Sequence, residues 1–128
     1  MKVTVKATHT KLTPAVEDRI ARICERLEKF ANVPDPDALE CNIEVGKITE
    51  HHRRGNVYRA EVNFTATGKY FRAVAEGETE VAALDLAHDE IKHELVHWKH
   101  REQSLVRRLG DRFKEWWHRL AVETGSNQ

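Results

Sequence analysis

Three histidines on one face of a predicted helix are the residues of this sequence best suited to metal binding or proton transfer. His93, His97 and His100 follow one another at helical spacing, and an imidazole can bind a metal or, when protonated, donate to phosphate. A zinc site needs further ligands beside such a pair, and only Glu90 is suitably placed on the same face. The sequence has no Cys-x-x-Cys and no His-Glu-x-x-His segment. We therefore predict a surface of histidines that holds no metal.

The other groups that could catalyse a reaction stand without partners. Ser104 is a single serine in a charged helical segment, and Asp89 beside His93 falls on the exposed side of a predicted helix. The six glycines are scattered and form no phosphate-binding loop. We predict that the protein is not an enzyme, and that it takes neither a cofactor nor a small-molecule substrate.

The two cysteines fall at inward-looking positions. Cys24 lies in a predicted helix and Cys41 in a predicted strand, each in register with the apolar residues around it. Cysteine in such positions behaves as a small buried hydrophobe. We expect two buried free thiols rather than a disulfide or a metal pair.

A row of basic side chains follows one flank of the first predicted helix. Thr13 is the expected N-cap of this helix, Pro14 is its first residue, and the segment from Asn32 ends it. The basic residues are Arg19, Arg22, Arg26 and Lys29. The helical wheel places Glu17, Glu25 and Glu28 on the other side, with Asp18 near the boundary. A one-sided basic row on a rigid helix suits contacts with phosphates. The alternative is an ordinary solvated face whose charges happen to sort.

Charge is also unevenly distributed along the chain, although the net charge is zero. Residues 1–30 carry seven basic and four acidic side chains, whereas residues 76–95 carry one basic and seven acidic. Residues 96–119 are again basic, with seven basic and three acidic groups. A partner responds to the local potential, so a neutral protein can still present a positive face.

Hydropathy alternation predicts an α+β fold of one core. Strands are expected at residues 2–7, 39–45, 58–66 and 70–75, the last three pairing antiparallel. The first helix lies between the first two strands, and Thr79 caps a second helix after the fourth. The order is β-α-β-β-β-α. Since each strand has one apolar face, both helices should cover one side of a four-stranded sheet, giving two layers.

A C-terminal helical extension, residues 102–128, should follow an α+β domain at residues 1–101, and Gly110 could break or bend it. Its apolar stripe is Leu105, Leu109, Phe113, Trp116 and Leu120. The stripe could fold back on the domain, pair with a second copy, or contact RNA or a membrane surface. The charged open side of the sheet discourages folding back, so we expect a homodimer through residues 105–120.

No segment has the continuous apolar length of a membrane span, and the N-terminus lacks the apolar run of a signal peptide. We expect a cytoplasmic protein that does not act at a membrane.

Two stretches resemble the bacterial ribosome hibernation-promoting factors and ribosome-associated inhibitors, also called the sigma-54 modulation protein family. They are residues 12–30, Leu-Thr-Pro-Ala-Val through Arg-Leu-Glu-Lys-Phe, and residues 72–85, Arg-Ala-Val-Ala-Glu-Gly-Glu-Thr through Ala-Ala-Leu-Asp. The resemblance covers about residues 1–101 and implies a four-stranded sheet with two helices on one face, similar to double-stranded-RNA-binding domains. It also implies binding to the small ribosomal subunit near the decoding centre, and inhibition of translation under stress without catalysis.

Some positions depart from the family pattern. Glu90, His93 and His97 stand where the family commonly has Lys or Arg, and Ile23 replaces a basic residue of the first helix. The chain resembles the short form, since too few residues follow Arg101 for the long form's dimerisation domain.

We therefore expect a translation inhibitor that contacts small-subunit ribosomal RNA. The expected nucleic-acid-binding residues are Arg19, Arg22, Arg26, Lys29, Lys92, His93, His97, Lys99, His100 and Arg101. The alternative is a protein-interaction or metal-responsive module that uses the histidine face and the C-terminal helix.

Overall fold

The computed structural model describes residues 1–48 and 57–125, apart from the side chains of Phe113, Trp117 and residues 120–125. The element order confirms the predicted β-α-β-β-β-α arrangement. The elements are β1 (Lys2–Thr8), α1 (Pro14–Ala31), the short 3-10 helix η1 (Pro36–Ala38), β2 (Leu39–Lys47), β3 (Tyr58–Ala66), β4 (Lys69–Gly77) and α2 (Glu80–Gly125).

The four strands form one sheet in the order β1-β2-β3-β4. The last three strands pair antiparallel, as predicted, whereas β1 and β2 run parallel. Parallel neighbours need a crossover between them, and α1 supplies it. Thr67 and Gly68 join β3 to β4 with φ of 51° and 80°, the backbone of a tight hairpin turn whose two central residues both have positive φ.

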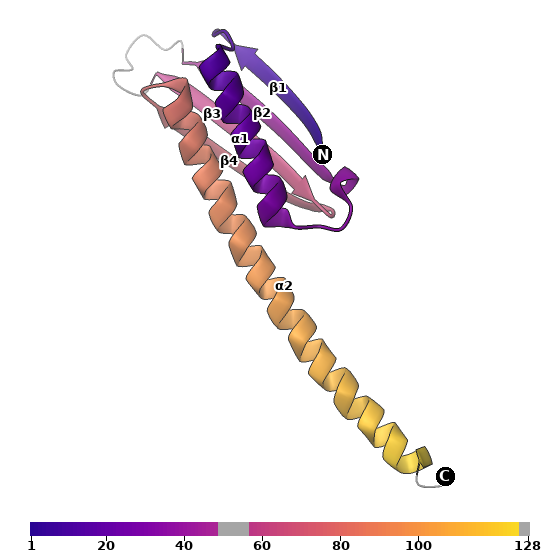
Figure 1. Cartoon of the computed structure of the whole chain (residues 1–128). Helices are drawn as coiled ribbons and strands as arrows, with labels where there is room; N and C mark the ends of the chain where they lie inside the picture. The colour runs from indigo at the N-terminus through magenta and orange to yellow at the C-terminus, as the bar shows by residue number, and fades with distance from the viewer. Residues whose placement is uncertain (49–56, 126–128) are drawn as a thin grey trace. The chain divides into compact units, whose positions relative to one another are not determined.

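Both helices lie on the same face of the sheet, as predicted: α1 and the first part of α2 lie in front of the strands in Figure 1. The largest fully buried side chains come from the strands and from both helices, and include Leu27, Ile43, Phe64, Leu84 and Ile91. Residues of β2 and β3 alternate between buried and half-exposed positions. The core is therefore the layer between helices and sheet, and the other sheet face meets water.

The boundaries of α1 follow from its sequence. The Thr13 side chain accepts a hydrogen bond from the Val16 amide at 3.3 Å, and Pro14 is the first helical residue. Asn32 ends the helix in the left-handed region, with φ 46° and ψ 53°, and donates its amide to the Glu28 carbonyl. Asparagine tolerates this conformation better than most residues. Both ends agree with the sequence prediction.

The first strand is less buried than its alternation suggests. Residues 2–7 are all exposed, including Val3 at 43% and Val5 at 36%. The reason is that the valines face an open groove of about 440 Å³ between β1 and α1. The groove is lined by Val3, Val5, Leu12, Glu17, Ile20, Ala21 and Cys24. The apolar face that the sequence predicts for this strand is therefore present but not covered.

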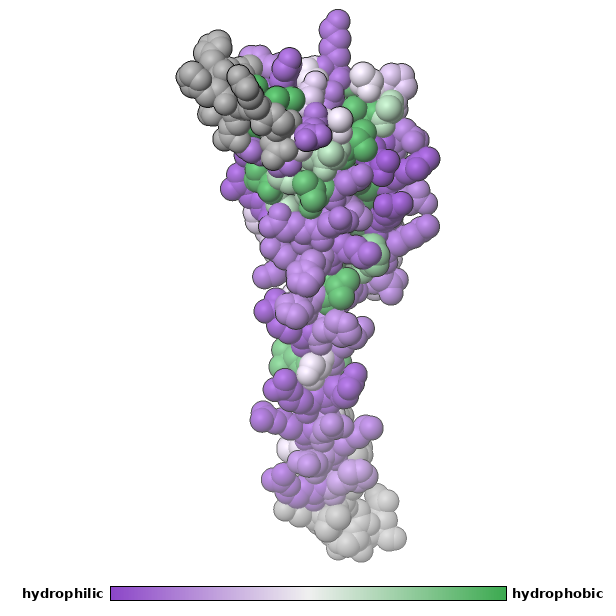
Figure 2. Space-filling model, turned by 90° about the vertical axis from the view of Figure 1, so that its left-hand side faces the viewer, coloured by the Kyte–Doolittle hydropathy of each residue, from purple (hydrophilic) through white to green (hydrophobic). Residues whose placement is uncertain are grey.

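The chain divides into two compact units, Met1–Val96 and His97–Gln128. The second unit contains the C-terminal part of α2. Gly110 lies inside this helix, so the expectation that it could break the helix is wrong: a helical glycine costs about 0.5–1 kcal/mol relative to alanine, less than a break requires. On the face of this segment seen in Figure 2, hydrophilic side chains predominate.

We predict opposite effects from adding a methyl group at two glycines that both face open space. A Cβ at Gly68 or at Gly110 would meet no atom within 4 Å. Gly110→Ala should stabilise α2 locally by about 0.5–1 kcal/mol, because alanine lowers the conformational entropy of the unfolded chain. Gly68→Ala should lower global stability by about 1 kcal/mol, because only Gly68 has positive φ.

Hydrogen exchange of the amides around position 110 measures the first effect, and urea unfolding measures the second. Faster exchange in Gly110→Ala would contradict the expected gain in helix stability.

Candidate nucleic-acid interface

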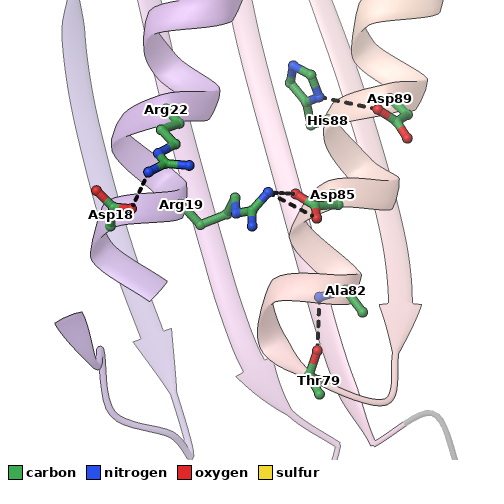
Figure 3. Close-up of polar contacts among 8 residues, drawn as sticks. All are labelled: Asp18, Arg19, Arg22, Thr79, Ala82, Asp85, His88 and Asp89. Atoms are coloured by element: carbon green, nitrogen blue, oxygen red, sulfur yellow. Dashed lines mark hydrogen bonds and ion pairs between the residues drawn. The ribbon is translucent and has the colours of Figure 1, made fainter. Parts of the chain in front are cut away.

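The basic row of α1 begins with an arginine that also connects the two helices. Arg19 Nη1 lies 3.2 Å from Asp85 Oδ1 and 3.3 Å from Asp85 Oδ2, on the first part of α2. Figure 3 shows the two side chains meeting between the helices. The side chains of Arg19 and Asp85 are 31% and 41% exposed, so water screens the pair in part. Arg19 therefore positions α1 against α2 with one nitrogen, and its other N–H groups make no hydrogen bond within the described chain.

The next members of the row pair with acidic residues one turn away. Arg22 Nη2 lies 3.3 Å from Asp18 Oδ2, as Figure 3 shows, and Lys29 Nζ lies 3.3 Å from Glu25 Oε1. The acidic and basic side chains of α1 are therefore less separated than the sequence predicts. Residues four apart differ by only about 40° around a helix, so Glu25 reaches the flank of Lys29 rather than the opposite side.

Arg26 is exposed and makes no ion pair with any residue that the structure describes. The two pairs around it are well exposed: the Arg22 and Asp18 side chains are 58% and 64% accessible, and those of Lys29 and Glu25 are 76% and 65%. Exposed ion pairs of this kind contribute about 0–1 kcal/mol and are screened by salt. The cations of this row can therefore exchange an intrahelical carboxylate for an external anion at little cost.

One predicted residue of α2 lies beside the end of α1. Lys92 Nζ sits 4.9 Å from the centroid of the Phe30 ring, close enough for a cation–π interaction. Phe30 follows Lys29 directly in α1. The first unit therefore gathers the basic row of α1 and Lys92 into one region.

The remaining predicted residues lie further along α2. His93 is exposed and belongs to the first unit; His97, Lys99, His100 and Arg101 belong to the second. Within the second unit His97, His100 and Arg101 are exposed, and Lys99 is half-buried. Together these side chains place two permanent cations and two imidazoles on adjoining turns.

His88 is a polar core residue that the sequence analysis missed. It is 4% exposed, its Nδ1 lies 3.4 Å from Asp89 Oδ1, and its Nε2 has no hydrogen-bond partner within the described chain. Figure 3 shows the ring on the flank of α2, with Asp89 as the contact. A signal was available, because position 88 lies one helical turn from Leu84 and three residues before Ile91, both in the core.

No three His, Cys, Asp or Glu side chains within residues 1–48 and 57–125 lie together in a way that could hold a metal ion. The described helices also contain no stretch long and apolar enough to cross a bilayer.

Comparison with known proteins defines the family. The family described as "Sigma 54 modulation protein / S30EA ribosomal protein" matches residues 3–103. The chain belongs to this family, which confirms the resemblance seen in the sequence. No curated protein sequence matches the chain.

Two solved structures share the fold. The N-terminal domain of Protein Y from Thermus thermophilus superposes with a TM-score of 0.59 at 20% identity, covering 77% of this chain and 99% of that one. A ribosomal subunit interface protein from Coxiella burnetii gives a TM-score of 0.58 at 16% identity, covering 77% and 98%. At these identities the likeness concerns the fold.

Proposed function

We propose that this protein is a ribosome-associated translation inhibitor that docks on small-subunit ribosomal RNA near the decoding centre in stressed cells. The observation that carries the proposal is the exposed basic row of α1, on a helix that is held in place by its buried apolar stripe. Family membership supports the ribosome as the partner, so the protein would act in the cytoplasm, where ribosomes are found.

The chemistry of docking follows from the ion pairs. RNA phosphates would replace Asp18 and Glu25 as partners of Arg22 and Lys29, and Arg26 would meet a phosphate without losing any partner. Arginine can contact two phosphate oxygens at once, which fixes orientation as well as charge. Arg19 would add to the row while its bond to Asp85 holds α1 in place. Lys92, beside Phe30, would extend the row onto α2.

The turns of α2 that follow would add further contacts. Lys99 and Arg101 carry permanent charge, and His93, His97 and His100 offer imidazole nitrogens that can donate a hydrogen bond to phosphate. No catalytic step is part of the proposal: the protein would occupy its site and exclude the ligands of an active ribosome.

We predict that replacing Arg22, Arg26 and Lys29 together by glutamine weakens binding to small ribosomal subunits and makes it less sensitive to salt. If each residue neutralises one phosphate, the log–log salt slope should become shallower by about 2 to 3. The melting temperature should change little, because the lost ion pairs are exposed. Co-sedimentation across a salt series measures both the affinity and the slope.

A matched variant removes the same charge elsewhere. Lys2, Lys6 and Arg59 alternate with the inward-facing residues of β1 and β3, so they lie on the open side of the sheet. Replacing these three by glutamine should leave binding nearly unchanged. Equal loss in both variants would mean that net charge, and not the row of α1, determines binding.

We also propose that the second unit mediates a homodimer through residues 105–120. Its described apolar side chains are well exposed, with Leu105 at 50%, Leu109 at 53% and Trp116 at 50%. Phe113 and Leu120, the other members of the predicted stripe, lie outside the described side chains. Burying each large apolar side chain contributes about 1.5–3 kcal/mol, and a second copy offers the same stripe under two-fold symmetry.

We predict that light scattering gives a dimer for the wild type and a monomer for Leu105→Glu, Leu109→Glu. Val106→Glu is the matched control, because Val106 is 65% exposed and points about 100° away from Leu105 around the helix. A wild type that remains monomeric at high micromolar concentration would rule out the dimer.

A further inference from the structure

The two cysteines of the chain lie together beneath the groove between β1 and α1. Cys24, on α1, is 7% exposed and lines the groove, whereas Cys41, on β2, is fully buried. Val3 also lines the groove and is the direct neighbour of Cys41 in the parallel register of β1 and β2. Neighbours in register point to the same side of a sheet, so Cys41 points toward α1 and Cys24.

The two thiols differ in how readily they ionise. The neighbouring Cys41 thiol lowers the pKa of Cys24 despite the burial of Cys24. The proximity of Cys24, together with burial, raises the pKa of Cys41. Cys24 is therefore the thiol of the pair that ionises more readily.

Access also separates the two residues. The groove has a volume of about 440 Å³, and Cys24 belongs to its mostly apolar lining whereas Cys41 does not. A small uncharged oxidant that enters the groove can therefore meet Cys24, whereas Cys41 is fully buried. Reactive cysteines combine a stabilised thiolate with partial access in this way.

We propose that Cys24 and Cys41 form an oxidation site for peroxides, with Cys24 as the attacking thiol and Cys41 as the resolving thiol. The Cys24 thiolate attacks one oxygen of hydrogen peroxide, the O–O bond breaks, and hydroxide leaves and takes up a proton to become water. Cys24 is then a sulfenic acid. Cys41 attacks the Cys24 sulfur, an S–S bond forms, and the departing hydroxide takes the Cys41 proton to leave as a second water.

The balance is two thiols and one peroxide giving one disulfide and two waters, so the two thiols supply both electrons. The product is a covalent bond between α1 and β2. This modification site does not depend on the proposed ribosome binding, and its test uses no ribosome.

The test treats the folded, full-length protein with hydrogen peroxide and analyses it by non-reducing peptide mapping and intact mass. The wild type should yield an intramolecular Cys24–Cys41 disulfide, with loss of two hydrogen atoms, reversed by dithiothreitol. Cys41→Ser should stop at a Cys24 sulfenic acid that dimedone traps. Cys24→Ser should leave Cys41 unmodified, and alkylation of Cys41 should be slower than that of Cys24 by about tenfold or more in the wild type.

Circular dichroism of each serine variant verifies that it is folded, and the same reactions in denaturant should abolish the difference between the two thiols. The proposal is overturned if the folded wild type accumulates sulfenic or sulfinic acid without a disulfide, or if both thiols resist peroxide until the protein unfolds. Equal alkylation rates for Cys24 and Cys41 in the folded protein would overturn the assigned roles.

Discussion

The burial of the α1 stripe against the sheet is the interaction on which the other features depend. Val16, Ile20, Ile23 and Leu27 are 0–5% exposed, on successive turns of one helix. Once this stripe faces β2, the rotation of α1 about its axis is fixed. The basic row then lies on the flank of α1 from which Arg19 reaches α2, and Cys24 lies beside the groove between α1 and β1. One packing choice therefore places both the candidate RNA interface and the thiol pair.

Ion pairs on the helix surfaces adjust this arrangement but do not determine it. The bond between Arg19 and Asp85 joins the helices on their partly exposed side, where screening limits its contribution to stability. Its value is geometric, since it fixes the two helices that carry the basic residues. The pairs Arg22–Asp18 and Lys29–Glu25 are more exposed than this bond. A surface whose cations are held only by such pairs is suited to an exchange of partners with phosphates.

The sequence predicts the features that local chemistry determines. The Thr13 cap, the Asn32 end and the alternation of β2 and β3 were all identifiable, because hydrogen bonds and side-chain periodicity within a few residues decide them. The family resemblance extended the prediction to the sheet and its two helices.

Features that depend on distant parts of the chain were harder to predict. The exposure of Val3 follows from the open groove between β1 and α1, which alternation alone does not reveal. The burial of His88, in contrast, had a local signal, because His88 stands at helical spacing from the core residues Leu84 and Ile91. The error at Glu25 had a local cause, because its pairing with Lys29 follows from helical geometry.

If the basic flank of α1 contacts ribosomal RNA, site-specific photocrosslinking from this flank should capture the contact directly. A benzophenone side chain in place of Glu25 would lie on this flank without removing a cation of the row. The same group in place of Tyr70, which is 58% exposed on β4, is an aromatic-for-aromatic control. The probe at position 25 should crosslink to small-subunit ribosomal RNA when mixed with ribosomes, and the probe at position 70 should give little RNA product. Crosslinks from position 70 to RNA, with none from position 25, would show that the interface does not lie on α1.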